Sequence, residues 1–224
     1  MNIIIYDLET TGLEINKDKI IEGYFYNIKD QTCIHLICNP ELEIPCEVSK
    51  INGWTNMDLV GKKTFNEQIP DLLEFCTDKC IFIAHNNDNF DKLILLTNLI
   101  NCGYKRPKFW KFADTCKLAK IAFPNLENYK QETLQKKFNI KINNNHKANK
   151  DVLDLVKIYD KICNELKLDP INDIVDILKK SRNWIPKKMP FGKHKGKLIK
   201  TLPIDYKVWL KANINDRSLI KALS

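Results

Sequence analysis

The sequence predicts an α/β fold in which helices flank a mixed β-sheet, followed by a small basic C-terminal module. Three apolar, strand-like segments come first, and helices and strands alternate after them, which is typical of a layered α/β domain. Hydrophobic residues make up 44% of the 224-residue chain and charged residues 29%. This is the composition of a globular protein, and it excludes a disordered or collagen-like chain.

Five short apolar runs predict the strands of the sheet. The first, residues 2–8, is nearly continuous and rich in β-branched side chains, as expected of a strand that is buried on both faces. Residues 19–29 and 32–38 predict two strands that meet in a hairpin. Two shorter strands are expected at residues 80–84 and 109–113.

Apolar residues at helical spacing predict the helices. The clearest is an amphipathic helix over residues 147–166, whose apolar face is formed by Ala148, Val152, Leu155, Tyr159, Ile162 and Leu166. The same spacing predicts shorter helices over residues 65–75, 90–100, 115–123, 131–138 and 169–180. Helices between strands act as crossovers, so parallel strand pairs are expected beside the antiparallel hairpin.

The positive charge is concentrated at the C-terminal end. Residues 181–224 contain eleven Lys and Arg against two Asp and Glu, a net charge of +9, whereas residues 1–180 carry a net charge of −1. A basic segment of this kind indicates a polyanionic partner. Pro186, Pro190 and the stretch FGKHKGK mark a separate unit. We therefore expect a domain over residues 1–180 and a small basic module, nucleic-acid binding, over residues 187–224.

Cysteine usage and the lack of targeting signals predict a cytoplasmic protein. The eight cysteines are scattered and form no C-x-x-C pair, which favours free thiols in a reducing compartment. No apolar run approaches the roughly 18 residues that a membrane-spanning helix needs. The N-terminal segment lacks a basic region and leads directly into acidic residues, unlike a signal peptide. No membrane association is expected.

Two carboxylates follow the apolar first strand at its C-terminal end. Asp7 and Glu9 are two residues apart, and side chains two apart in a strand point to the same face. Two acids on one face of a buried strand repel each other unless a positive charge lies between them, and a divalent cation is the natural candidate. A strand end that emerges into solvent is the simpler alternative.

Further acids occur at two later element boundaries. Asp91 ends the segment HNNDNFD (residues 85–91), in the first turn of a predicted helix, where the helix dipole favours an anion. Asp151 lies at the start of the amphipathic helix, five residues after His146. Four acids in three segments form the oxygen-rich ligand set that Mg²⁺ or Mn²⁺ prefers. Two such ions about 3.5–4 Å apart can clamp the oxygens of a phosphodiester, and a neutral His146 could take a proton from the attacking water.

Together these motifs resemble a known nuclease family. D-x-E-T-T-G-L in the first strand, H-N…F-D at residues 85–91 and H-x4-D from His146 to Asp151 follow the order of the DEDDh (DnaQ-like) 3′–5′ exonucleases of the ribonuclease H-like superfamily. The similarity covers residues 1–165 or so. Lys147 stands where the tyrosine branch of the family has Tyr, so the chain resembles the histidine branch.

The resemblance implies a ribonuclease H-like fold and a two-metal-ion 3′–5′ exonuclease that hydrolyses DNA from the 3′ end to release 5′-mononucleotides. It implies two Mg²⁺ (or Mn²⁺) ions as cofactors and a single-stranded 3′ end of DNA as the partner, and no obligate protein partner is inferred. DNA is favoured through the resemblance to exonuclease X-type proteins. The alternatives are a 3′–5′ exoribonuclease and a non-catalytic nucleic-acid-binding protein that keeps the fold.

The resemblance also implies roles for the acids and the histidine. Asp7, Glu9 and Asp151 are expected to hold the catalytic metal ion, with Asp7 bridging to a second ion. Asp91 is expected to help bind the second ion. His146 is expected to act as the general base on the attacking water.

Other positions match family residues that contact the substrate. Thr10 and Leu13 match positions at the 3′-terminal nucleotide, where Leu13 is expected to pack against a base. His85 and Asn86 match positions close to the substrate. The second motif is one residue longer than usual, so Asp88 is the competing candidate for its acid.

The basic C-terminal segment resembles the small module of exonuclease X-type proteins. The shared features are F-G-K-x-x-G-K, a following Pro, and an aromatic residue before W-L. We expect Lys193, Lys195 and Lys197 to contact nucleic-acid phosphates. The aromatic residues could stack on bases, but a small core is the favoured interpretation. Its expected members are Phe191, Leu202, Tyr206, Trp209 and Leu210.

Overall fold

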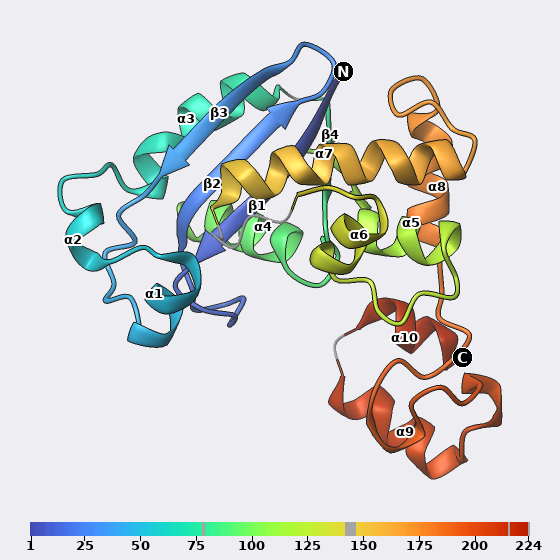
Figure 1. Cartoon of the computed structure of the whole chain (residues 1–224). Helices are drawn as coiled ribbons and strands as arrows, with labels where there is room; N and C mark the ends of the chain where they lie inside the picture. The colour runs from blue at the N-terminus through green and yellow to red at the C-terminus, as the bar shows by residue number, and fades with distance from the viewer. Residues whose placement is uncertain (78, 142–146, 215, 224) are drawn as a thin grey trace. The chain divides into compact units, whose positions relative to one another are not determined.

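The computed structural model describes residues 1–77, 79–141, 147–214 and 216–223 (Figure 1). The chain forms two compact units, Met1–Ser181 and Arg182–Ser224. All eight cysteines lie within the described residues and are free, as predicted. None of the helices in the described ranges is long and apolar enough to cross a membrane.

The first unit is built on one five-stranded mixed sheet, which confirms the predicted α/β fold. Its strands, in sheet order, are β3 (Thr32–Ile37), β2 (Ile20–Asn27), β1 (Asn2–Thr10), β4 (Cys80–Ala84) and β5 (Lys111–Asp114). β1 pairs antiparallel with β2 and parallel with β4, so it lies at the centre of the sheet. Each strand overlaps the apolar run that predicted it.

Helices cover both faces of this sheet. In chain order they are α1 (Cys46–Asn52), α2 (Asn56–Leu59), α3 (Phe65–Cys76), α4 (Asp91–Asn101), α5 (Thr115–Ala122), α6 (Gln131–Lys137), α7 (Ala148–Glu165) and α8 (Ile174–Asn183). Side chains of α3 and α4 pack on one face, and those of α5 and α7 pack on the other (Figure 1). The mixed sheet is thus buried between two helical layers.

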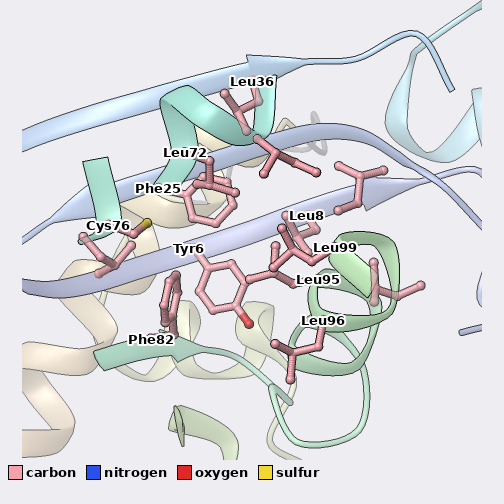
Figure 2. Packing of buried hydrophobic residues seen from close by; sticks show 14 of the residues in the cluster. Tyr6, Leu8, Phe25, Leu36, Leu72, Cys76, Phe82, Leu95, Leu96 and Leu99 are labelled. Carbon is pink, nitrogen blue, oxygen red and sulfur yellow. The ribbon is translucent and has the colours of Figure 1, made fainter. Parts of the chain in front are cut away.

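The two faces of β1 serve different purposes. Tyr6 and Leu8 point into the core under α3 and α4, where Figure 2 shows them among leucines of both helices. Ile5 points to the opposite face and packs with residues of α7. Because side chains alternate along a strand, Asp7 and Glu9 continue the row on the α7 side. The central strand therefore anchors one core and presents two acids to the other layer.

Five of the six predicted helices match the observed ones to within one residue at either end, and the sixth begins later than predicted. The predicted helix over residues 169–180 begins only at residue 174, because Asp169 accepts the backbone N–H groups of Ile171 and Asn172 and forms a turn first. The sequence analysis missed α1 and α2, which are short. A capping box between Thr55 and Asp58 stabilises α2, and this local device leaves no apolar periodicity.

The second unit contains α9 (Ile204–Asn213), α10 (Arg217–Ala222) and its own small core. Its buried apolar residues are Met189, Ile199, Leu202, Leu210, Leu219 and Leu223. The expected core included Phe191 and Trp209, and this was wrong: they are 41% and 53% exposed. Tyr206 and Leu210 are four residues apart on α9 and share its inner face, whereas Trp209 lies beside Tyr206 at the exposed edge of that face.

Candidate active site

Three carboxylates meet where β1 runs beside the start of α7. Asp7 and Glu9 come from β1, and Asp151 comes from the first turn of α7. Each offers one oxygen atom, and these atoms all lie within 4.8 Å of one another. We call these three residues the carboxylate cluster. Strand and helix periodicity singled out both segments in the sequence, and the fold brings them together.

Burial and mutual repulsion make it costly to ionise the carboxylate cluster without a cation. Burial, together with the charges of Asp151 and Glu22, raises the pKa of Asp7 to about 7. Burial and the charges of Asp7 and Asp151 raise the pKa of Glu9 to about 8. Ionised carboxylate oxygens are the ligands that hard divalent cations prefer. The donor set therefore fits a divalent metal ion.

The two candidate acids of the second motif have different surroundings. Asp91, the first residue of α4, is 4% exposed, and burial followed by the charge of Asp7 raises its pKa well above the ordinary value. Asp88 forms ion pairs with Lys92 at 2.9 Å and Lys117 at 2.7 Å. Burial alone raises the pKa of Asp88, but hydrogen bonds from both lysines lower it by more. Asp91 therefore interacts with the carboxylate cluster, while Asp88 is neutralised by lysines.

A cleft of about 500 Å³ opens beside the carboxylate cluster. It is lined by Asp7, Leu8, Glu9, Leu13, His85, Asn86, Asn89, Phe90, Asp91, Gln131, Glu132, Gln135 and Asp151. The structure thus brings together the four predicted acids and three predicted substrate positions. Sequence analysis missed the three polar residues of α6, because a helix face exposed to solvent has the same pattern.

The two residues expected at the terminal nucleotide have different environments. Leu13 is 81% exposed at the cleft. Thr10 is buried, and its hydroxyl donates to the carbonyl of Gly12 at 2.6 Å. A Cβ atom on Gly12 would lie 2.5 Å from the Oδ2 atom of Asp18, so a larger residue would displace a carboxylate that accepts hydrogen bonds from two neighbours in this turn. Thr10 therefore shapes the turn that presents Leu13.

His85 holds the chain segment before α6. Its Nε2 atom lies 2.7 Å from the carbonyl oxygen of Tyr129, and its Nδ1 atom lies 3.0 Å from the Thr115 hydroxyl. A carbonyl only accepts, so Nε2–H is the donor to Tyr129. Burial lowers the pKa of His85 to about 4, which keeps the ring neutral. Its neighbour Asn86 has φ 61°, a left-handed conformation that Asn tolerates.

The start of α7 is tied to the sheet by Glu22 of β2. Glu22 accepts the indole N–H of Trp54 at 2.8 Å and lies 2.8 Å from His35 Nε2. Burial alone raises the pKa of Glu22, but hydrogen bonds from His35, Trp54 and the backbone N–H of Ala148 lower it by more. The ammonium group of Lys147 lies 3.8 Å from the Trp54 ring centre. Sequence analysis missed Glu22 and Trp54.

The predicted general base, His146, lies outside the described residues. The next residue that is described, Lys147, directly precedes α7. The side-chain amide of Gln131 donates to the backbone carbonyl of Asp151 at 2.9 Å. The first turn of α7 is thus held from the sheet side by Glu22 and from the α6 side by Gln131.

The three predicted phosphate-binding lysines lie in the second unit. Lys193, Lys195 and Lys197 are all exposed. The Nζ atom of Lys193 lies 5.0 Å from the ring centre of Tyr206. These side chains form a basic loop that packs against α9 through Tyr206.

Two family models match different parts of the chain. One, described as exonuclease, matches residues 4–159. The other, described as putative quorum-sensing-regulated virulence factor, matches residues 179–214. The first covers most of the unit that contains the carboxylate cluster.

Curated relatives are about one third identical to this chain over the segments that match. The DNA polymerase III subunit epsilon of Aquifex aeolicus is 32% identical over 171 residues, which cover 73% of this chain and 81% of the relative. The 3′–5′ exonuclease DinG of Staphylococcus epidermidis is 31% identical over 158 residues, which cover 69% of this chain and 17% of the relative. The chain therefore spans most of the first relative and a small part of the second.

Solved structures share the fold at low sequence identity. A structure of exonuclease X in complex with 5′ overhanging duplex DNA has a TM-score of 0.63 and 18% identity, covering 80% of this chain and 99% of that one. Escherichia coli exonuclease I in complex with a dT13 oligonucleotide has a TM-score of 0.64 and 19% identity. The match covers 83% of this chain and 46% of that one. The likeness confirms the expected ribonuclease H-like architecture of the first unit.

Proposed function

The chain belongs to the exonuclease family, and from this premise we propose that it is a two-metal-ion 3′–5′ exonuclease that hydrolyses DNA from the 3′ end and releases 5′-mononucleotides. The observation that carries the proposal is the carboxylate cluster, whose oxygen atoms all lie within 4.8 Å of one another beside the cleft. Such a site stabilises positive charge and leaves room for a substrate phosphate next to it.

Each acid has a role in this proposal. Asp7, Glu9 and Asp151 would hold the catalytic divalent ion, Mg²⁺ or Mn²⁺, and Asp91 would help to hold a second ion together with Asp7. Bound divalent ions stabilise the charge that develops on the scissile phosphate and lower the pKa of water. The burial of Asp91 supports its role, because a buried acid is stabilised in its ionised form by a nearby cation.

His146 would act as the general base. An imidazole has an ordinary pKa of about 6.5, so one ring nitrogen is free to accept a proton at neutral pH. The water oxygen bonds to phosphorus as its proton passes to His146, the bond from phosphorus to the O3′ atom of the preceding nucleotide breaks, and O3′ takes up a proton from solvent. The products are a 5′-mononucleotide and a chain with a new 3′ hydroxyl group.

The cleft offers several contacts for the 3′-terminal nucleotide. We assign Leu13 to packing against the terminal base, because its side chain is exposed at the cleft. Thr10 would act by shaping the turn that carries Leu13, and Asn86 by lining the cleft near the substrate. His85 would act by holding the segment before α6. The assignment to DNA is supported by relatives whose names refer to DNA polymerase III and by related folds solved with DNA.

The two parts of the chain differ in net charge, and we propose a different role for each. Residues 1–180 would form the exonuclease domain, and residues 187–224 would form a nucleic-acid-binding module. Support comes from the net charge of +9 over residues 181–224 and from the exposure of Lys193, Lys195 and Lys197. Phosphate contacts by these lysines would give affinity that is independent of sequence and falls with salt.

A labelled-oligonucleotide assay tests the proposal. Single-stranded DNA carrying a label at the 5′ or the 3′ end is incubated with Mg²⁺, Mn²⁺ or EDTA, using the wild type and Asp7→Ala. The 5′-labelled strand should shorten stepwise, and the 3′ label should leave first as a mononucleotide. EDTA and Asp7→Ala should each abolish both signals.

Matched RNA strands decide between the alternatives. Cleavage of RNA but not DNA would establish the exoribonuclease instead. If neither strand is cleaved while both bind, the chain is a non-catalytic binding protein and the catalytic assignments are wrong. Mononucleotides released from the 5′ end first would contradict the proposed direction.

A further inference from the structure

The second unit exposes a tryptophan on a basic surface. Trp209 of α9 is 53% exposed (α9 is labelled in Figure 1). Tryptophan has the largest side chain, and half of it in water costs free energy that burial would recover. Its neighbour Val208 is 62% exposed. Exposure alone does not mark an interaction surface, and what distinguishes this ring is how it is held and the charge around it.

The ring of Trp209 is held in place by other rings. It stacks on Tyr206 with the ring centres 5.8 Å apart and an angle of 14° between the planes. Tyr206 also contacts the edge of His194, at 4.5 Å between centres, and lies under the ammonium group of Lys193. A Cβ atom on Gly192 would lie 3.2 Å from the Tyr206 hydroxyl, so the basic loop is closely packed against this ring. The aromatic surface is therefore assembled without a ligand.

The positive charge around Trp209 indicates which class of ligand this surface binds. The second unit carries eleven Lys and Arg and two Asp and Glu. Lys193 contacts the aromatic stack itself, and Lys195 and Lys197 follow it in the same loop. Flat rings beside a row of positive charges match a ligand with flat bases on a negative backbone. A duplex hides its base faces, whereas a single strand offers them.

We propose that Trp209, supported by Tyr206, is a base-stacking platform for single-stranded nucleic acid in the second unit, with the lysines of the adjacent loop neutralising its backbone. The inference rests on the proposed function only in requiring a nucleic-acid ligand. It assigns the second unit a stacking contact, which differs from a purely electrostatic clamp because it acts on unpaired bases. Stacking on aromatic rings tolerates any base, as a sequence-independent enzyme requires.

The test measures binding of the full chain to fluorescein-labelled oligo(dT), oligo(rU) and a DNA duplex. Fluorescence anisotropy is recorded in EDTA, so that cleavage does not interfere, over salt concentrations from about 50 to 400 mM. Trp209→Ala should weaken binding to single strands by about 5- to 150-fold at every salt concentration. The slope of log affinity against log salt should stay the same, because no phosphate contact is lost. Trp209→Phe should recover part of the loss.

Two control variants separate stacking from charge and from general damage. Lys195→Ala should reduce the magnitude of the salt slope by about 0.7 for a single strand. Ile204→Ala removes another exposed apolar side chain from α9, at 80% exposure, and should leave binding unchanged. If oligo(dT) and oligo(rU) respond alike, the platform does not distinguish the sugar.

The outcomes also separate this inference from the proposed function. If Trp209→Ala binds both single strands as the wild type does, the platform is wrong, whether or not the wild type cleaves DNA in Mg²⁺. An equal loss on the duplex and on single strands would also overturn it, because paired bases cannot stack on the ring. If the wild type does not cleave DNA but Trp209→Ala still weakens binding to single strands, the stacking platform is supported and the nuclease activity is not.

Discussion

The ammonium group of Lys147 lies 3.8 Å from the centre of the Trp54 indole ring, and the N–H group of the same ring donates to the buried carboxylate of Glu22. Glu22 also accepts the backbone N–H of Ala148, the first residue of α7. A loop, a strand and a helix start are therefore joined by one tryptophan. This junction fixes the turn of α7 that carries Asp151.

Removing the indole donor should destabilise the protein. Trp54→Phe keeps a ring for Lys147 but leaves Glu22 one hydrogen bond short, which should lower the free energy of unfolding by about 1–3 kcal/mol in urea denaturation. Trp54→Leu also removes the cation–π contact and should cost about 0.5–1 kcal/mol more. Met57→Leu, at a side chain 82% exposed on α2, should leave stability unchanged. Equal stability of Trp54→Phe and wild type would contradict the role of this junction.

The two acids of the second motif should give opposite phenotypes. Asp88→Asn removes the ion pairs with Lys92 and the buried Lys117, and should cost about 2 kcal/mol or more of stability while leaving kcat within a few-fold. Asp91→Asn should leave stability nearly unchanged but lower kcat by about a hundredfold or more. Urea denaturation and single-strand digestion measure the two effects. The reverse pattern would make Asp88 the catalytic acid.

Leu13 should matter for substrate binding and not for stability. Its side chain is 81% exposed, so Leu13→Ala should change the free energy of unfolding by less than about 0.5 kcal/mol. Loss of its packing against a base should lower kcat/KM by up to about tenfold, mainly through KM. Steady-state digestion of a labelled single strand gives both constants. An unchanged KM would show that the terminal base lies elsewhere.

His85 should make the protein less stable in mild acid. Its pKa is lowered by burial to about 4 in the folded chain, against the ordinary 6.5. As the pH falls below about 6.5 the unfolded chain takes up a proton that the folded chain does not, so stability is lost down to about pH 4. The loss amounts to at most about 3 kcal/mol. In His85→Gln the free energy of unfolding should depend less steeply on pH, and an identical slope would show that His85 is not held neutral.

Without metal, a rising pH should lower the stability of the protein through the carboxylate cluster, whereas a bound metal ion should raise it. The raised pKa values of Asp7 and Glu9 mean that, without metal, the folded chain holds protons that the unfolded chain releases above about pH 4. Stability in EDTA should therefore fall as the pH rises toward 8. Asp7→Asn should be at least as stable as the wild type in EDTA at about pH 8. Mn²⁺ should raise the Tm of the wild type more than that of the variant, and equal gains would place the ion elsewhere.

Periodicity predicted most of the sheet and its helices because buried elements leave long apolar patterns. The segment over residues 80–84 is a continuous apolar run, and it is a strand with the same bounds. α2 has four residues and is stabilised by a capping box, so no pattern marks it. In the second unit both Trp209 and Leu210 were expected in the core, and only Leu210 is buried.

The site residues that could be predicted are those whose orientation follows from the periodicity of their own strand or helix. Asp7 and Glu9 share a face by strand alternation, and Asp151 falls at the edge of an apolar helix face. Glu22 was not predictable, because its place depends on the register in which it pairs with Glu9 across two strands. Trp54 lies in a loop, and no local pattern relates it to Lys147 far along the chain.

The central position of β1 sets how the site will fail under stress. It pairs with β4 over residues 2–5 and with β2 over residues 4–10, so the amides of its first half should be among the slowest in the unit to exchange with deuterium. Asp7 and Glu9 are kept together by the pairing of β1 with β2, whereas Asp151 is held beside them by the hydrogen bonds that Glu22 and Gln131 make to the first turn of α7. If these few side-chain contacts break before the strand ladder does, mild heating should cost activity reversibly, with Asp7 and Glu9 still paired to β2.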